Sequence, residues 1–151
     1  MKPLFFGGIA CGAAGLLHFA IIAGGAQWYR YFGAGEEAAL LAAQGAIGNT
    51  LRTAGIAVVL LLFGFYAVDI ARGGRRLPWR RTILAGVATV FVLRGLLGIP
   101  LVLLGTGPYL DELRQRMGFV VSTSAVALAI GLCYLHGVIR LGRQPAEAPP
   151  P

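Results

Sequence analysis

The chain has few charged residues, and acidic ones are especially scarce. Of its 151 residues, 13% are charged, and only six are aspartate or glutamate against 13 lysines and arginines. Soluble domains carry about 25% charged residues, so a charged, water-facing surface is excluded for most of this chain. The hydrophobic content of 57% and the mean hydropathy of +0.74 indicate that lipid is the solvent. The sequence therefore predicts an integral membrane protein.

The sequence motifs of common enzyme classes are also lacking. The two cysteines, Cys11 and Cys133, form no Cys-x-x-Cys pair, which a redox enzyme normally needs. The Gly-x-Gly run at 33–35 follows no predicted strand and has no third glycine, so it is not a nucleotide-binding loop. The two histidines, His18 and His136, differ by roughly 10 Å or more in predicted depth, which argues against a shared metal. We therefore predict no catalytic residue, no metal and no cofactor.

Four apolar runs are long enough to cross a membrane, which takes about 20 helical residues. They cover residues 4–26, 51–71, 82–104 and 118–141. Nothing alternates polar and apolar residues at period two, and lipid cannot satisfy an isolated strand, so the runs predict helices. Short connections favour an all-α, up-and-down, integral membrane four-helix bundle. We expect a single transmembrane domain over residues 1–143 and a disordered, proline-rich tail at 144–151.

Glycine is abundant, with 23 residues, and often recurs four positions from another small residue. Examples are the pairs Gly8/Gly12, Cys11/Gly15 and Ala127/Gly131. In a membrane this spacing lets two helix backbones approach closely. The sequence thus predicts tight helix–helix contacts along the first and last spans.

Basic residues are unevenly divided between the two ends of the predicted spans. One end carries eight of them: Lys2, Arg72, Arg75, Arg76, Arg80, Arg81, Arg140 and Arg143. The other end carries four: Arg30, Arg52, Arg114 and Arg116. The positive-inside rule places the first end in the cytoplasm, so we expect a multi-pass inner-membrane protein with both termini cytoplasmic. These residues lie where lipid headgroups are, and they do not indicate nucleic-acid binding.

The segment 27–50 is the one sizeable loop that the sequence predicts. Glycines at 33 and 35 break the chain, and the run from Glu36 to Gln44 predicts a short helix with two acids at its start, where the helix dipole favours them. Gly45 ends this helix. The alanines and leucines of this short helix are too apolar for free solution. We therefore expect the helix to lie at the membrane interface or to fold into the mouth of the bundle.

Arg94 is the one ionisable side chain in the third predicted span. An arginine at mid-span costs about 2.5–3.5 kcal/mol on translocon scales, so it is expected to face the bundle interior and to have a partner. His18 lies at a similar predicted depth, roughly 12–15 Å below the outer boundary. Two interpretations stay open. Arg94 and His18 line an outward-facing pocket roofed by the first loop, or Arg94 pairs with Glu36 or Glu37 and locks that loop in place.

A secondary polar pair is predicted near the cytoplasmic ends of the second and fourth spans. Asp69 and His136 lie there at similar depth, and an Asp–His pair is able to relay protons. The alternative is that Asp69 pairs with Arg72 while His136 extends to the membrane interface. The sequence leaves both arrangements open.

Three short runs carry a resemblance to other proteins: WYRYFGAGE at 28–36, LRG at 93–95 and GLCYLHG at 131–137. In these the chain resembles a group of small, uncharacterised bacterial four-span inner-membrane proteins. Its size and span count are also similar to those of DoxX-type proteins, by architecture alone. The resemblance implies that Arg94, His18, Arg30 and Glu36 belong to one shared design. It implies no reaction, cofactor or substrate.

Three classes of function are consistent with these features. The favoured hypothesis is a non-enzymatic protein that binds an amphiphilic or anionic small ligand in an outward-facing polar pocket around Arg94. One alternative is a structural subunit of a larger membrane complex or of a homo-oligomer. The other is a small membrane enzyme that uses His18 as a base or Cys11 and Cys133 as a redox pair. Membrane lipids are expected partners in every case.

The predicted orientation is testable with reporter fusions. A reporter joined after Arg76 should lie in the cytoplasm, and one joined after Gly45 should lie outside, because basic residues concentrate at the first end. Alkaline phosphatase, active only outside, and a fluorescent protein that folds only inside give opposite signals at each site. A cytoplasmic signal at Gly45 would overturn the topology.

Overall fold

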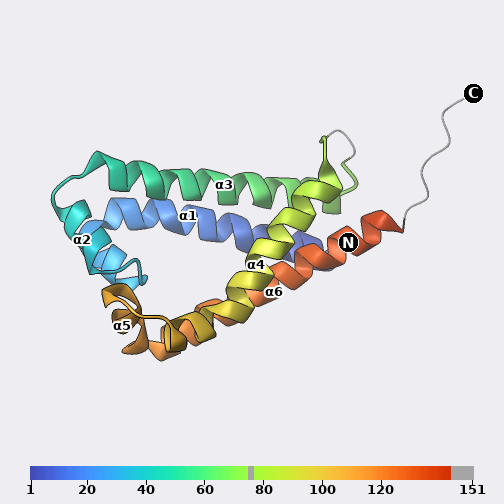
Figure 1. Ribbon diagram of the computed structural model, residues 1–151. Helices are drawn as coiled ribbons and strands as arrows, with labels where there is room; N and C mark the ends of the chain where they lie inside the picture. The colour runs from blue at the N-terminus through green and yellow to red at the C-terminus, as the bar shows by residue number, and fades with distance from the viewer. Residues whose placement is uncertain (75–76, 144–151) are drawn as a thin grey trace, which may run out of the picture.

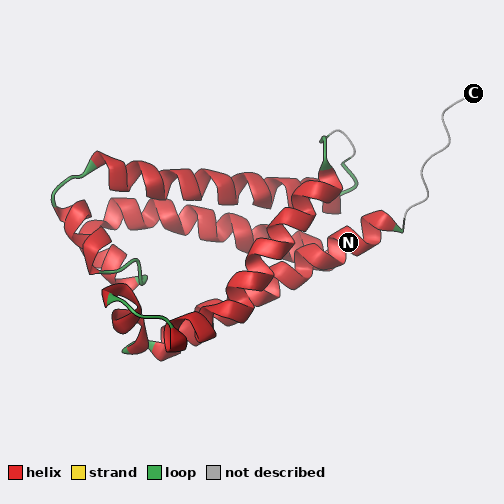
Figure 2. Ribbon diagram, in the orientation of Figure 1, coloured by secondary structure: helices red, strands yellow, loops and turns green. Residues whose placement is uncertain are grey.

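The computed structural model describes residues 1–74 and 77–143, and these are helical with no strand (Figures 1 and 2). The long helices are α1 (Lys2–Tyr31), α3 (Ile47–Ala71), α4 (Arg80–Leu104) and α6 (Met117–Gly142), and the short ones are α2 (Glu36–Ala43) and α5 (Pro108–Arg114). Each of the four long helices is apolar and long enough to span a membrane.

The helices predicted from hydropathy are confirmed in number and closely in extent. The helix predicted to begin at Glu36 is confirmed as α2, whereas α5 is not predicted by the sequence. The disorder predicted for 144–151 concerns residues outside the described ones, as does the placement of Arg75 and Arg76.

The long helices form two antiparallel hairpins, α1 with α3 and α4 with α6. The hairpins meet where the N-terminus and the α3–α4 connection lie, which we call the terminal end (Figure 1). They diverge toward α2 and α5, which we call the loop end (Figure 1). Contacts between the hairpins are mainly of α1 with α6, and α3 touches α4 little. The bundle is therefore a wedge that is closed at one end.

Backbone contact holds each hairpin together. A Cβ atom on Gly64 of α3 would lie 2.8 Å from the carbonyl oxygen of Gly8 and 2.9 Å from the backbone nitrogen of Gly12, both in α1. In the second hairpin, a Cβ on Gly131 of α6 would lie 2.7 Å from the backbone nitrogen of Val92 in α4. The close approach predicted for small residues in these spans is thus confirmed, and its stabilisation comes from dispersion between backbones.

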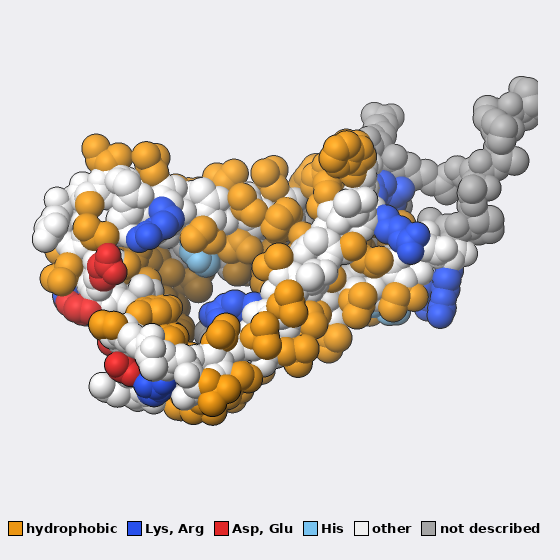
Figure 3. Space-filling view, viewed as in Figure 1, with side chains coloured by type: hydrophobic (Ala, Val, Ile, Leu, Met, Phe, Trp, Pro, Cys, Tyr) orange, Lys and Arg blue, Asp and Glu red, His pale blue; other side chains and the backbone are white. Residues whose placement is uncertain are grey.

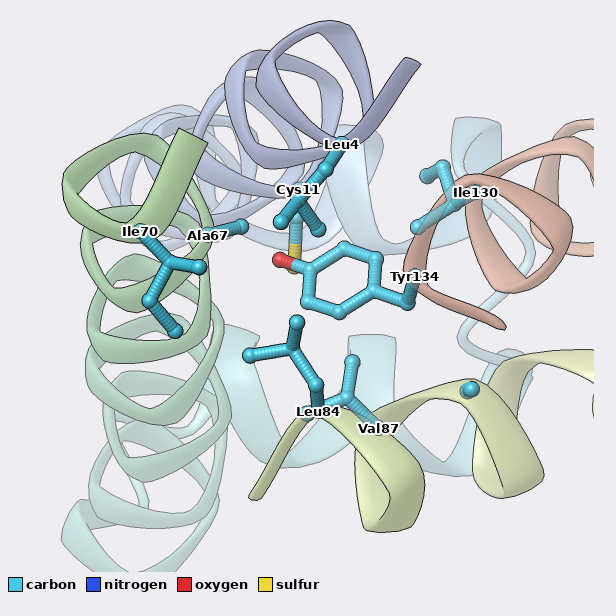
Figure 4. Packing of buried hydrophobic residues seen from close by; sticks show 9 residues of the cluster. Leu4, Cys11, Ala67, Ile70, Leu84, Val87, Ile130 and Tyr134 are labelled. Atoms are coloured by element: carbon cyan, nitrogen blue, oxygen red, sulfur yellow. The ribbon is translucent and has the colours of Figure 1, made fainter. Parts of the chain in front are cut away.

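All four long helices meet around Tyr134 at the terminal end. Its ring is fully buried, between Leu4 and Cys11 of α1, Ile70 of α3 and Leu84 of α4 (Figure 4). Its hydroxyl donates a hydrogen bond of 2.9 Å to the carbonyl oxygen of residue 63 in α3. This bond satisfies the one polar atom of the ring and ties α6 to the opposite hairpin.

Glycines produce the main breaks and reversals near the loop end. Gly25 interrupts α1 with φ 65° and ψ −156°, so residues 26–31 form a separate helical segment. Gly33 and Gly45, with φ 71° and 67°, lie just after the ends of α1 and α2. There they allow the left-handed turn that pairs the last helical carbonyls with following N–H groups. By contrast, α4 continues as a helix through Pro100.

The contact between α1 and α3 predicts that the stability of the protein depends strongly on Gly64. Gly64→Val should lower the free energy of unfolding by about 1–3 kcal/mol, because its side chain would overlap backbone atoms that have no rotamer to change. The measurement is thermal unfolding in detergent, followed by circular dichroism.

Gly86 supplies the matched control. A Cβ there meets nothing within 4 Å, so Gly86→Ala should leave stability unchanged or raise it by about 0.5–1 kcal/mol through helix propensity. Equal loss of stability in both variants would contradict the proposed role of the α1–α3 contact.

Candidate functional site

Divergence of the hairpins leaves a polar cleft of about 730 Å³ toward the loop end. Three basic side chains line it from the spans: His18 of α1, Arg52 of α3 and Arg94 of α4. Three carboxylates line it from the loop helices: Glu36, Glu37 and Glu112. Figure 3 shows the hollow between the hairpins, with basic and histidine side chains beside it. The structure thus gathers His18, Arg94, Glu36 and Glu37 around one cavity, as the pocket interpretation predicts.

A second, mainly apolar hollow of about 570 Å³ adjoins the cleft. Its walls come from positions nearer the terminal end, such as Phe63 in α3, Val90 in α4 and Ile130 in α6. Ile56 and Arg94 line both cavities. Arg94 therefore lies at the boundary between a polar and an apolar compartment, each within the range of about 300–1,000 Å³ that is common for small-molecule sites.

The Arg94 side chain turns toward the loop end. Its Nη1 atom lies 3.6 Å from the position that a Cβ on Gly98 would occupy, one helical turn further along α4. The Ser124 hydroxyl of α6 lies 2.5 Å from that same position, and it is buried without a hydrogen-bond partner among the described residues. The absence of a side chain at Gly98 therefore leaves room for both groups, of which Arg94 lines the cleft.

The predicted ion pair of Arg94 with Glu36 or Glu37 is wrong. Within residues 1–74 and 77–143, Arg94 forms no ion pair, and Glu36 is held by Arg30 through two hydrogen bonds of 2.6 Å. Arg30 is close because the turn after α1 folds α2 back beside it, whereas Arg94 is far deeper in the bundle. These hydrogen bonds from the Arg30 guanidinium, with its charge, hold the pKa of the Glu36 carboxyl below its usual value.

His18 presents one ring nitrogen to the cleft. Its Nδ1 lies 2.7 Å from the carbonyl oxygen of Ala14. A carbonyl only accepts, so Nδ1 carries the hydrogen and Nε2 of the neutral ring is left as an acceptor. His18 is thus able to accept a hydrogen bond from a bound group.

A buried polar chain that the sequence analysis missed supports one wall of the cleft. The Tyr29 hydroxyl donates to Thr53 Oγ1 at 3.0 Å, and Asn49 Nδ2 donates to the carbonyl oxygen of Ala38 at 3.2 Å. Arg52 donates to Asn49 Oδ1 at 3.0 Å. These bonds join α1, α2 and the first turns of α3. The signal in the sequence is the run of polar residues that opens an otherwise apolar helix.

The loop end is closed by a latch between α5 and the turn after α1. The Tyr109 hydroxyl donates to the carbonyl oxygen of Gly33 at 3.1 Å, and Arg116 donates to the carbonyl oxygens of residues 30–31. Glu112 accepts the backbone N–H that begins α2, at 3.0 Å. The latch therefore bridges the two hairpins above the cleft, and it uses residues that the sequence analysis did not single out.

The secondary polar pair lies at the terminal end, away from the cleft. The Asp69 carboxylate packs against Gly74, and no hydrogen bond joins Asp69 to the half-buried His136 among the described residues. Nor does Asp69 form an ion pair with Arg72 there. The Arg72 guanidinium instead lies 5.4 Å from the ring centre of Phe5.

Both cysteines are free thiols with different neighbours. The Cys11 thiol lies 3.5 Å from the carbonyl oxygen of Leu60, whereas Cys133 packs against Gly7. In the described part of the chain, no group of three or more histidine, cysteine or acidic side chains is arranged to hold a metal.

The latch, rather than Arg94, should hold the first loop in place. Arg116→Ala removes the hydrogen bonds to residues 30–31, and we expect opening of the loop end to become easier by about 1 kcal/mol, or about fivefold faster amide exchange over 30–37. Hydrogen–deuterium exchange with mass spectrometry measures this. Arg94→Gln is the control and should leave exchange there unchanged. If Arg94→Gln accelerated it as much, the locking interpretation would be restored.

Comparison of the chain with protein-family models, with curated proteins and with solved structures gave no match. The resemblance carried by the runs at 28–36, 93–95 and 131–137 therefore stays a prediction. The role of the cleft has to be inferred from its own residues, their charge and their placement.

Proposed function

We propose that this protein binds an amphiphilic ligand with an anionic head group in the cleft, and that it does so without catalysing a reaction. The observation that carries the proposal is the place of Arg94, at the boundary of the polar cleft and the apolar hollow. An amphiphile has the same two parts in the same order. Its chain would occupy the apolar hollow, and its head would lie in the polar cleft.

The energetics of an arginine at mid-span support an anionic head. A charge at mid-span is costly, and a guanidinium that has five donors and no carboxylate partner within the described residues gains most from a bound anion. Bidentate arginine–carboxylate and arginine–phosphate pairs are the strongest hydrogen bonds of this kind. His18 lines the same cleft and is a further polar side chain that would be available to a head group.

The proposal places the four long helices across a bacterial inner membrane, with the loop end outside and both termini in the cytoplasm. This placement rests on the excess of basic residues at the terminal end. The cleft then opens in the outer leaflet, where lipids with their chains toward the membrane centre are the nearest amphiphiles. Access from the side is favoured by the gap between the hairpins, since α3 and α4 touch little.

Native mass spectrometry of protein extracted with its lipids tests the proposal. The parent protein should retain a molecule of lipid size, and Arg94→Ala should weaken its binding about tenfold or more, because a charged hydrogen bond is lost. His18→Ala should weaken binding less. Arg140→Ala, an exposed arginine at the terminal end, is the matched control and should retain the ligand.

Two outcomes would count against ligand binding. In the first, the parent retains bulk lipid alone, in amounts that Arg94→Ala does not change. In the second, a larger partner protein co-purifies with every variant, and the cleft carries no bound molecule. The second outcome would favour the subunit alternative.

A further inference from the structure

We propose that the ligand is a zwitterionic amphiphile, with a phosphate next to its chain and a protonated amine beyond the phosphate. This inference rests on the proposed function and deepens it, because it assigns a second charge to the head group. It is carried by the order of charges along the cleft, from the apolar hollow to the loop end.

The basic groups of the cleft all belong to the spans. Arg94 lies ten residues before the end of α4, or about 15 Å along the helix axis, and His18 lies seven residues before the break in α1, or about 10 Å. Arg52 lies five residues into α3, or about 8 Å from its start, and donates to Asn49. Arg94 and His18 therefore lie in the deeper part of the cleft, whereas the Arg52 guanidinium reaches Asn49, nearer the loop end.

The acidic groups of the cleft all belong to the loop helices. Glu36 is neutralised by Arg30, but Glu37 has no ion-pair partner among the described residues. Glu112 accepts a backbone N–H through Oε2, which leaves its net negative charge in place. The carboxylates of Glu37 and Glu112, neither of which forms an ion pair among the described residues, thus line the outer part of the same cleft.

The order of compartments matches the order of groups in such a ligand. From the terminal end outward, the walls are apolar, then polar at Arg94 and His18, and then hold the carboxylates of Glu37 and Glu112 together with Arg52. A phosphoethanolamine lipid presents a chain, then a phosphate, then an ammonium group. The Arg94 guanidinium turns toward Gly98, which lies six residues before the end of α4, or roughly 9 Å along the helix axis. This distance leaves room for a head group between the two layers.

A purely anionic amphiphile fits the acidic layer less well. With a neutral glycerol head, for example, its phosphate would still meet Arg94, but nothing would compensate Glu37 and Glu112. Placing an ammonium group there adds attraction, which is modest for exposed charges and is screened by salt. The acidic layer should therefore set selectivity, whereas Arg94 should set affinity.

The test compares two probes with the same phosphate and acyl chain, whose groups beyond the phosphate are an aminoethyl cation and a neutral glycerol: lysophosphatidylethanolamine and lysophosphatidylglycerol. Dissociation constants are measured by native mass spectrometry titration of the protein in a neutral maltoside detergent at low salt. The parent should bind the ethanolamine lipid at least about threefold more tightly, from one or two exposed charge pairs. Glu37→Gln should reduce this preference, and Glu37→Gln with Glu112→Gln should abolish it. Arg94→Ala should weaken binding of both probes.

Asp111→Asn is the matched control, because Asp111 carries a carboxylate at the loop end but does not line the cleft. It should keep the parent's preference. Equal binding of both probes by the parent, or tighter binding of the glycerol lipid, would overturn the zwitterion inference and leave the proposed function standing if Arg94→Ala still weakened both. Binding of neither probe by the parent would overturn the inference and the proposed function together.

Discussion

The structure depends on an unequal division of contacts. The long helices touch backbone to backbone within each hairpin, but the long helices of different hairpins pack together mainly near the terminal end. Gly64 against Gly8 and Gly131 against Val92 leave no room for side chains within the hairpins. Between the hairpins, Tyr134 gathers all four long helices at the terminal end through its buried ring and its bond to α3. In lipid there is no hydrophobic force to press the remaining helix faces together, so such packing contacts decide where helices meet. The wedge, and hence the cleft, follows from their absence at the loop end.

The wedge also explains how an arginine is tolerated at mid-span. In a uniformly packed bundle Arg94 would need a carboxylate beside it, because an unpaired charge in a packed interior is very unfavourable. Here the side chain turns toward Gly98 and faces a polar cleft instead. The latch of α5 on the turn after α1 keeps the loop helices above this cleft without drawing their carboxylates down to Arg94. Arg94 therefore takes no part in holding the loop end closed.

The sequence predicted what depends on hydropathy and local chemistry. The four long helices, the helix that begins at Glu36 and the close contacts of Gly8 and Gly131 follow from patterns of neighbouring residues. What it missed depends on how segments distant in the chain are placed. The pairing of Glu36 with Arg30 rather than Arg94 is set by the turn at Gly33, and the role of Tyr134 is set by helix crossing. Neither has a periodic signal. The similar depth of His18 and Arg94 could be predicted, because the depth of a residue in a span needs only a count of residues.

The placement of basic groups on the spans and acidic groups on the loop helices affects which ligands the cleft would select. Arg94 lies at mid-span, where surrounding lipid would screen it from salt, whereas Glu37 and Glu112 lie on short loop helices. A ligand group bound at Arg94 therefore gains more free energy than one bound at the acidic layer. Under the proposed function, such a division would separate two tasks along one axis: the deep layer would retain an amphiphile in the membrane, and the outer layer would distinguish between head groups. A docking subunit would need neither layer, since contacts with a partner helix require only the outward apolar faces. The alignment of an apolar hollow, a basic layer and an acidic layer is what favours a bound lipid-like molecule over a purely structural role.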